Sequence, residues 1–125
     1  ISPLTRARIE TSIADLKTEL GESAADPKTM QEAVTAYRAA LDLYKRQGAP
    51  NEAWARVELG LTTALVYLSD REQGAGSLDE ALDAINDAIS VTDKTGHPLE
   101  WAQLQSTLGN VLRLLGDHTG DPSQY

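Results

Sequence analysis

The feature that most constrains this chain is a helical pattern that recurs after about 48 residues. Between Leu78 and Asp117, apolar residues fall at i, i+3, i+4 and i+7 spacing, in two runs separated by Gly96 and Pro98. Glycine and proline at such a point end one helix and open the next. This stretch therefore predicts two amphipathic helices joined by a short turn. Their apolar faces are too wide for the pair to bury alone, so the hairpin needs neighbours.

The rest of the chain supplies similar helices. Three landmarks recur at a spacing of 47 or 48 residues: Glu32-Ala33 with Glu80-Ala81, Pro50 with Pro98, and Trp54-Ala55 with Trp101-Ala102. A self-match of this period is typical of helical repeat arrays, in which each helix pair covers the next. The matched proline and tryptophan favour a true repeat over a chance similarity between two ordinary helices.

The periodicity predicts five helices and no sheet, because no stretch alternates Val, Ile and Thr over the length of a strand. The predicted helices cover Pro3–Leu20, Lys28–Gln47, Asn51–Ser69, Leu78–Lys94 and Leu99–Leu115. The first helix is expected to end at Gly21 and to bury an aliphatic stripe. That stripe consists of Ile9, Ile13, Leu16 and Leu20. The expected fold class is all-α, with antiparallel helix-turn-helix repeats stacked as an α-α superhelix.

Residues 1–125 are expected to form a single domain that is a fragment of a longer array, because the first and last helices each lack one partner. The array would contain a half repeat over 1–21, repeats over 28–69 and 78–117, and a tail over 118–125. A length of 125 residues suits one domain with its own core.

The net charge and the composition exclude some kinds of partner and suggest where the protein is located. The formal net charge of −8 argues against nucleic acid and anionic membranes as partners, because no basic stripe is present to neutralise phosphates. The chain has no cysteine, no run long enough to span a bilayer and no signal peptide, so we expect a cytoplasmic protein.

Residues 79–89 and 108–117 resemble the tetratricopeptide repeat. That family pairs a first helix carrying an LGN-like step, here Leu108-Gly109-Asn110, with a second helix carrying small residues, here Ala81 and Ala88. The period exceeds the usual 34 residues, because two loops are lengthened and the first helix gains a turn. Long repeats with a Pro-x-x-Trp-Ala opening, as at Pro98, are similar to those of bacterial multi-repeat proteins. The resemblance implies a right-handed stack of helix pairs and a role in protein–protein interaction.

In that family, the first helices of successive pairs line a concave groove that binds peptides or partner helices. Carried over to this chain, the groove would be formed by Arg8, Thr11, Asp15, Thr18, Arg56, Leu59, Thr63, Val66, Tyr67, Gln103, Ser106, Asn110 and Arg113. Leu59, Val66 and Tyr67 would form an apolar patch of the kind that marks binding sites, unless neighbouring repeats or solvent cover them. A clamp for a partner's C-terminal carboxylate is not expected, because only Asn110 matches the family pattern at that step.

The sequence offers no strong sign of catalysis. His97 and His118 have no second histidine or cysteine at ligand spacing, so no metal site is expected. The stretch Glu72–Ser77 has two glycines before a helix, but it lacks a preceding strand and a phosphate-binding pattern. We therefore expect a protein that is not an enzyme and that carries no cofactor.

Three functional hypotheses remain from the sequence. The leading one is a non-catalytic scaffold that binds a protein or peptide in the groove. The second is a regulatory or sensor segment of a larger signalling protein. The third is self-association as a homodimer through the fifth helix. On that helix Leu104, Val111, Leu114 and Leu115 would lack a following helix to cover them.

Overall fold

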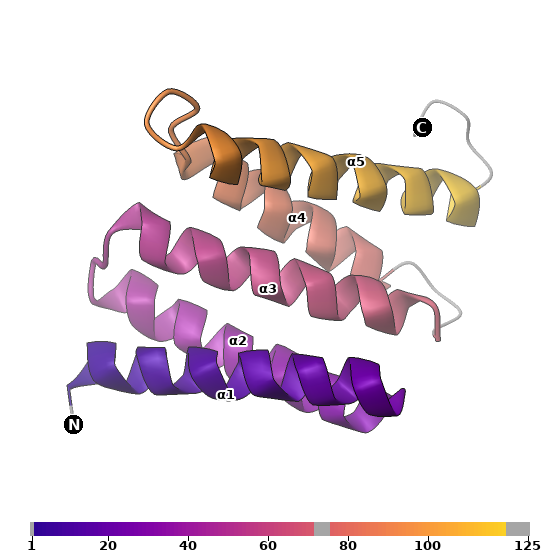
Figure 1. The fold of residues 1–125 in the computed structure, drawn as a ribbon, viewed down its shortest axis with the longest axis horizontal. Coiled ribbons are helices and arrows are strands. Elements are labelled where there is room, and N and C mark those ends of the chain that lie inside the picture. Colours follow the sequence, from indigo (N-terminus) through magenta and orange to yellow (C-terminus); the bar gives the residue numbers. More distant parts are fainter. Residues whose placement is uncertain (1, 72–75, 120–125) are drawn as a thin grey trace.

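The computed structural model describes residues 2–71 and 76–119, and every regular element within these ranges is an α-helix (Figure 1). The helices are α1 (Pro3–Ala24), α2 (Pro27–Arg46), α3 (Asn51–Ser69), α4 (Gly76–Val91) and α5 (Pro98–Thr119). The prediction of an all-α chain with five helices and no strand is confirmed for the described residues. Of the predicted tail, residues 118 and 119 belong to α5, and the remainder lies outside the described ranges.

The five helices form two layers, with α1, α3 and α5 in one and α2 and α4 behind them (Figure 1). The most extensive contacts join α1 to α2 and α3 to α4, so the chain is built from two hairpins. Helix α2 packs against α3 and connects the hairpins, and α5 packs against α4. No described helix combines the length and the apolar character that crossing a membrane would require.

Local side chains explain where α1 and α2 begin. The Ser2 hydroxyl accepts a hydrogen bond from the Thr5 backbone N–H at 3.1 Å, and Pro3 occupies the first turn of α1. Asp26 has the same role for α2, because its carboxylate accepts from the Lys28 N–H at 3.1 Å. The Thr29 hydroxyl donates to the same carboxylate at 2.7 Å, and this bond is the main cause that lowers the pKa of Asp26.

The predicted end of the first helix at Gly21 is wrong, because α1 continues to Ala24. Gly21 is buried in a close contact between helices, where an added Cβ would lie 3.1 Å from Met30 Cε. The helix ends at Ala25, which adopts a left-handed conformation with φ 52° and donates its N–H to the Glu22 carbonyl. Glycine at position 21 therefore serves packing rather than termination. Likewise α5 passes through the buried Gly116 and extends beyond its predicted end at Leu115.

The repeat-matched tryptophans share one kind of contact but differ in burial, because Trp54 belongs to the core and Trp101 is half-buried. Lys45 lies over the ring of Trp54, with its Nζ 4.8 Å from the ring centroid. Lys94 lies over the ring of Trp101 at 4.7 Å. In both cases the cation comes from the end of the preceding helix or from the turn after it, and such contacts stabilise both partners.

The predicted stripe of the first helix is not buried. Ile9 and Ile13 are 45% and 39% exposed, and Leu16 and Leu20 are 60% and 61% exposed. Helix α1 instead faces α2 with its small residues, which are Ala7, Ala14, Thr18 and Gly21. Small side chains permit a close approach of two helices, so α2 covers that side, and no described helix covers the opposite one.

The prediction that the fifth helix exposes its aliphatic residues is also wrong. Leu104, Val111 and Leu115 are buried, and Leu114 is half-buried against the core. Leu104 packs in a cluster with Ile85 and Ala88 of α4 and Ala55 of α3. The side of α5 that remains open carries smaller residues, which include Ala102 and Gly109. These two positions match Ala55 and Thr62 of α3, which are buried.

Candidate interaction surface

The residues of the predicted groove lie on α1, α3 and α5, which share one layer (Figure 1). Eight of them are exposed: Arg8, Asp15, Arg56, Thr63, Gln103, Ser106, Asn110 and Arg113. Four are half-buried, namely Thr11, Leu59, Val66 and Tyr67, and Thr18 is buried. The layer therefore presents a mostly polar surface rather than an apolar groove.

The expected apolar patch on α3 is largely taken up by internal contacts. Leu59 packs against the cluster that contains Leu104, and Val66 and Tyr67 pack against the main core. The Tyr67 hydroxyl donates to the Gly21 carbonyl at 3.3 Å, and Arg71 lies over its ring at 4.1 Å. The Tyr67 hydroxyl therefore ties α3 to α1, and the internal contacts of all three residues leave little apolar surface for a partner.

Two polar residues of the predicted groove also have internal partners. Asp15 accepts a hydrogen bond from the Tyr37 hydroxyl at 2.5 Å. Burial, and then the bond to Asp15, raise the pKa of Tyr37, so its hydroxyl stays protonated and remains a donor. Arg113 donates to Asn110 Oδ1 at 2.7 Å and pairs with Asp117 at 3.4 Å.

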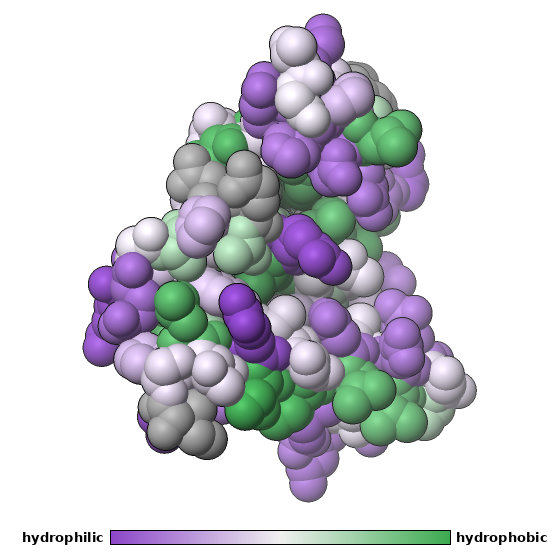
Figure 2. All heavy atoms as spheres, turned by 60° about the vertical axis from the view of Figure 1, so that its left-hand side comes forward, coloured by the Kyte–Doolittle hydropathy of each residue, from purple (hydrophilic) through white to green (hydrophobic). Residues whose placement is uncertain are grey.

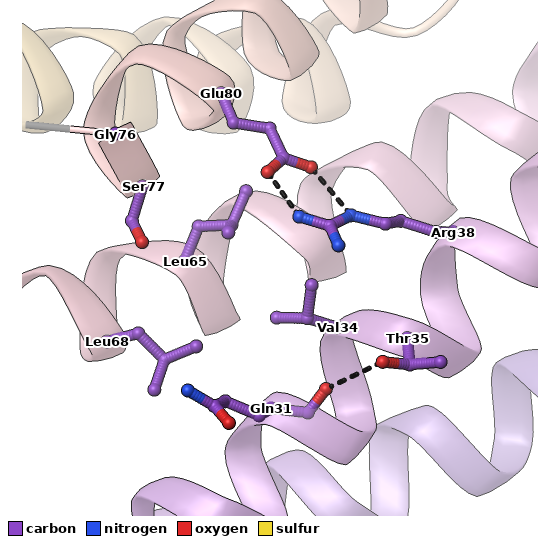
Figure 3. A pocket seen from close by; sticks show the side chains of 9 residues that line it. All are labelled: Gln31, Val34, Thr35, Arg38, Leu65, Leu68, Gly76, Ser77 and Glu80. Carbon is purple, nitrogen blue, oxygen red and sulfur yellow. Dashed lines mark hydrogen bonds and ion pairs between the residues drawn. The ribbon is translucent and has the colours of Figure 1, made fainter.

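The sequence did not predict a groove between α2 and α4, whose floor is formed by α3. One part has a volume of about 400 Å³ and is lined by Gln31, Val34, Thr35, Arg38, Leu65, Leu68, Gly76, Ser77 and Glu80 (Figure 3). The adjoining part has a volume of about 520 Å³ and is lined by Leu41, Glu58, Leu61, Glu80, Asp83, Ala84, Asn86 and Asp87. Glu80 belongs to both parts, so they form one groove.

Two ion pairs cross this groove. The Arg38 guanidinium pairs with both carboxylate oxygens of Glu80, and Lys45 Nζ lies 2.9 Å from Asp87 Oδ2 (Figure 3 shows the first pair). Each partner advances by seven residues, or two turns, from one pair to the next, so α2 and α4 run parallel. The hydrogen bonds to Glu80 and Asp87 raise the pKa values of Arg38 and Lys45. The two ion pairs share a spacing of 42 residues, which is the trace that this groove leaves in the sequence.

Replacing Arg38 by alanine is expected to lower the free energy of unfolding by less than about 1 kcal/mol, because both side chains of its ion pair are exposed to solvent. Urea unfolding of the wild type, of R38A and of E80Q would measure the effect. A loss greater than about 2 kcal/mol would contradict the expectation, since it would mean that the pair contributes as much as a buried contact.

Glu58 lies at the floor of the groove and is 3% exposed, although it is a carboxylic acid. Its Oε1 has no hydrogen-bond partner among the described residues. Burial, and then the neighbouring carboxyl of Asp87, raise its pKa to about 8, while Lys45 opposes the shift. Burial acts in the same direction on Asp87, but hydrogen bonds to Lys45 and Glu58 outweigh it and lower the Asp87 pKa. At neutral pH a protonated Glu58 therefore lies beside an ionised Asp87.

Among residues 2–71 and 76–119, no group of three or more His, Cys, Asp or Glu side chains is arranged to hold a metal ion. The acidic residues of the groove are instead distributed along α3 and α4, and Glu80 and Asp87 each already pair with a basic residue of α2. The groove is thus a polar seam between two helices, and its apolar floor residues are themselves buried.

Among the described residues, exposed large hydrophobic side chains gather on α1. Four of the large hydrophobic residues that the structure exposes form one stripe on this helix: Ile9, Ile13, Leu16 and Leu20. Figure 2 shows hydrophobic atoms gathered toward the lower end of the molecule, at the level where α1 lies in Figure 1. A contiguous apolar surface of this kind often marks an interaction site.

No protein-family model, no curated protein and no solved structure matches this chain. The resemblance to tetratricopeptide repeats, the bacterial origin and the cytoplasmic location stay predictions. The four residues Ile9, Ile13, Leu16 and Leu20 form the aliphatic stripe of α1.

Proposed function

We propose that this chain is a non-catalytic, tetratricopeptide-like scaffold that binds a partner protein through an amphipathic helix. The observation that carries the proposal is the exposure of the aliphatic stripe on α1. The sequence predicted the contact surface on the mostly polar face shared by α1, α3 and α5. The proposal places it instead on the exposed stripe of α1. It assigns neither a reaction nor a cofactor to the chain.

The internal repeat explains what this stripe is suited to bind. Its four residues match Val57, Leu61, Ala64 and Leu68 of α3, and then Leu104, Leu108, Val111 and Leu115 of α5. All the matched residues are buried except Leu108, which is half-buried. In α3, Leu61 and Leu68 line the groove beside α2. In α5, Leu104 packs against Ile85 and Ala88 of α4.

The matching face of α3 thus lies between α2 and α4, and that of α5 packs against α4, whereas on α1 the face is open. Helices α2 and α4 provide the covering surfaces, and each is amphipathic, with alanines and several larger residues, such as Tyr37 and Ile85, toward the core. An apolar stripe that accepts such a helix uses the same physical contacts as other helix-binding grooves. We infer that α1 accepts a partner helix in the way that α3 accepts α2.

A synthetic peptide of residues 26–47, which form α2 and its cap, provides a probe for this proposal. Fluorescence anisotropy of the labelled peptide is expected to show saturable binding to the 125-residue chain. Replacing Leu16 and Leu20 together by glutamate is expected to weaken binding at least about tenfold, because charges would replace the apolar contacts. Both side chains are about 60% exposed, so the fold should tolerate the change.

The matched control is Leu99→Glu, which changes another exposed leucine in the first turn of α5, away from the stripe. This variant should bind the peptide like the wild type. Absence of binding, or equal binding by all three proteins, would contradict the proposal. Circular dichroism of each variant would verify that the helices are intact.

A further inference from the structure

We infer that the helix that covers the aliphatic stripe is α1 of a second copy of this chain, lying antiparallel to the first across a two-fold axis. The inference rests on the proposed function, because it identifies the helix that the stripe accepts. It assigns the self-association of the chain to α1 at one end of the stack rather than to α5 at the other.

The spacing of the stripe suits a helix–helix seam. Its residues are separated by four, three and four positions, which is the a/d spacing of a coiled coil. The stripe lies on the side of α1 opposite to its small residues Ala7, Ala14 and Thr18, which face α2. A second helix can therefore lie along the stripe without displacing α2.

The charges of α1 favour an antiparallel pair. Its first half carries Arg6, Arg8 and Glu10 and has a net charge of +1, whereas its second half carries Asp15, Lys17, Glu19 and Glu22 and has a net charge of −2. An antiparallel arrangement places the positive half of one helix beside the negative half of the other. A parallel arrangement would place like charges side by side along the whole seam.

Individual residues flanking the stripe support the same orientation. With Ile9 opposite Leu20 of the second copy, and Ile13 opposite Leu16, Arg8 of one helix approaches Glu19 of the other. On the other flank, Glu10 approaches Lys17, which is half-buried and already pairs with Glu32 of α2 at 3.0 Å. The two-fold axis repeats each of these contacts with the roles of the two chains exchanged, so every pair occurs twice in the dimer.

The seam spans the twelve residues from Ile9 to Leu20 and is short for a stable interface. We therefore expect a reversible dimer whose population depends on concentration. In sedimentation equilibrium, the apparent mass should rise from the monomer value of 13.5 kDa toward twice that value between about 1 μM and 1 mM protein. The L16E/L20E variant should stay at the monomer mass throughout, and L99E should dimerise like the wild type.

Cysteine variants test the orientation, because the natural chain contains no cysteine. In the antiparallel pair, the two copies of residue 16 lie about three residues apart along the axis, or roughly 4–5 Å, whereas the copies of residue 9 lie roughly 16 Å apart. A short bismaleimide should therefore cross-link L16C to a dimer and leave I9C monomeric. Cross-linking of both variants would indicate a parallel pair and would overturn the orientation.

Charge reversal gives an independent test. R8E should weaken the dimer, because it places a carboxylate at position 8 of one chain beside Glu19 of the second copy, and the double variant R8E/E19R should restore it. Failure of the double variant to restore dimerisation would overturn the assigned pairing.

A monomer mass at every concentration would overturn the inference. Binding of the peptide of residues 26–47 would then test the proposed function separately. If that peptide still binds the wild type and not L16E/L20E, the helix-accepting stripe stands and only the second copy is wrong. If neither the peptide nor a second copy binds, both proposals are overturned.

Discussion

Replacing Glu58 by glutamine is expected to raise the free energy of unfolding at pH 8.5 by roughly 3–5 kcal/mol, and to change it little near pH 4. Glu58 is 3% exposed and lies beside Asp87, so its ionisation in the folded chain is costly. Glutamine has nearly the same shape, keeps an N–H donor for the Asp87 carboxylate and carries no charge. Urea unfolding of both proteins between pH 4 and pH 9 would measure the difference.

The sign follows from the pKa of Glu58, which rises from 4.5 to about 8 on folding. Below pH 4.5 the side chain is protonated in both states, so the stabilisation from its raised pKa is fully present. Between pH 4.5 and pH 8 the unfolded chain releases this proton and the folded chain retains it, so the stability of the wild type falls as the pH rises. The groups facing Glu58 are Asp87, which favours the protonated form, and Lys45, which opposes it.

The matched control is Glu100→Gln, which makes the same chemical change at an exposed position in the first turn of α5. Its unfolding curve should follow that of the wild type across the pH range. A Glu58→Gln variant whose stability falls with pH as steeply as the wild type would show that Glu58 is not the buried acid responsible.

Replacing Gly60 by alanine is expected to lower the free energy of unfolding by roughly 2–4 kcal/mol, because the new methyl group would overlap with a buried ring. A Cβ at this position would lie 2.6 Å from Tyr37 Cζ and 2.7 Å from Tyr37 Oη. The ring is 2% exposed, and its hydroxyl donates to Asp15 and lies 3.4 Å from Thr18 Oγ1. It therefore cannot move aside without breaking these contacts. Thermal and urea unfolding would measure the loss.

Gly109→Ala is the matched control, because Gly109 is also within a helix but has no atom within 4 Å of an added Cβ. That change should stabilise the chain by up to about 1 kcal/mol, as expected for alanine in an open helical position. Shortening Tyr37 to leucine should make the Gly60→Ala change less costly, and a double-mutant cycle would show this coupling. Equal effects of alanine at positions 60 and 109 would contradict the account.

The number and type of the elements followed from the sequence, because each helix carries an apolar pattern of the helical period over several turns. The ends were harder to predict. Gly21 and Gly116 looked like stop signals, yet both are buried inside helices. The sequence alone does not distinguish a glycine that ends a helix from one that allows a neighbouring helix to pack closely. At Gly21 the nearby Met30 side chain shows that the second role applies.

The covered face of α1 was not predictable from periodicity alone. This helix has small residues on one side and aliphatic residues on the other, and hydropathy favours burial of the second. The structure buries the first, because α2 can approach Ala7 and Ala14 more closely than it can approach Ile13. The repeat contained the missing information, since Leu61 of α3 matches Ile13 and lines the groove beside Leu41 of the preceding helix, α2.

The groove between α2 and α4 was missed for a different reason. Its two ion pairs join residues 42 positions apart, and neither helix alone indicates which charges will meet. No sequence pattern singled out Glu58, and only the arrangement of α2, α3 and α4 shows that it is buried.

The two sides of α1, α3 and α5 differ in the size of their side chains, so the two ends of the described chain offer different surfaces to a further unit. In α3 the larger Leu61 lies beside Leu41 of α2, whereas the smaller Ala55 packs with residues of α4 and α5. The matching positions of α1 and α5 also alternate between larger and smaller residues. A unit joined ahead of α1 would bury many methylene groups, whereas a unit joined behind α5 would close over Ala102 and Gly109. The interface free energy between neighbouring units would therefore differ at the two junctions. Burial of apolar surface would dominate ahead of α1, and close approach of helix backbones would dominate behind α5.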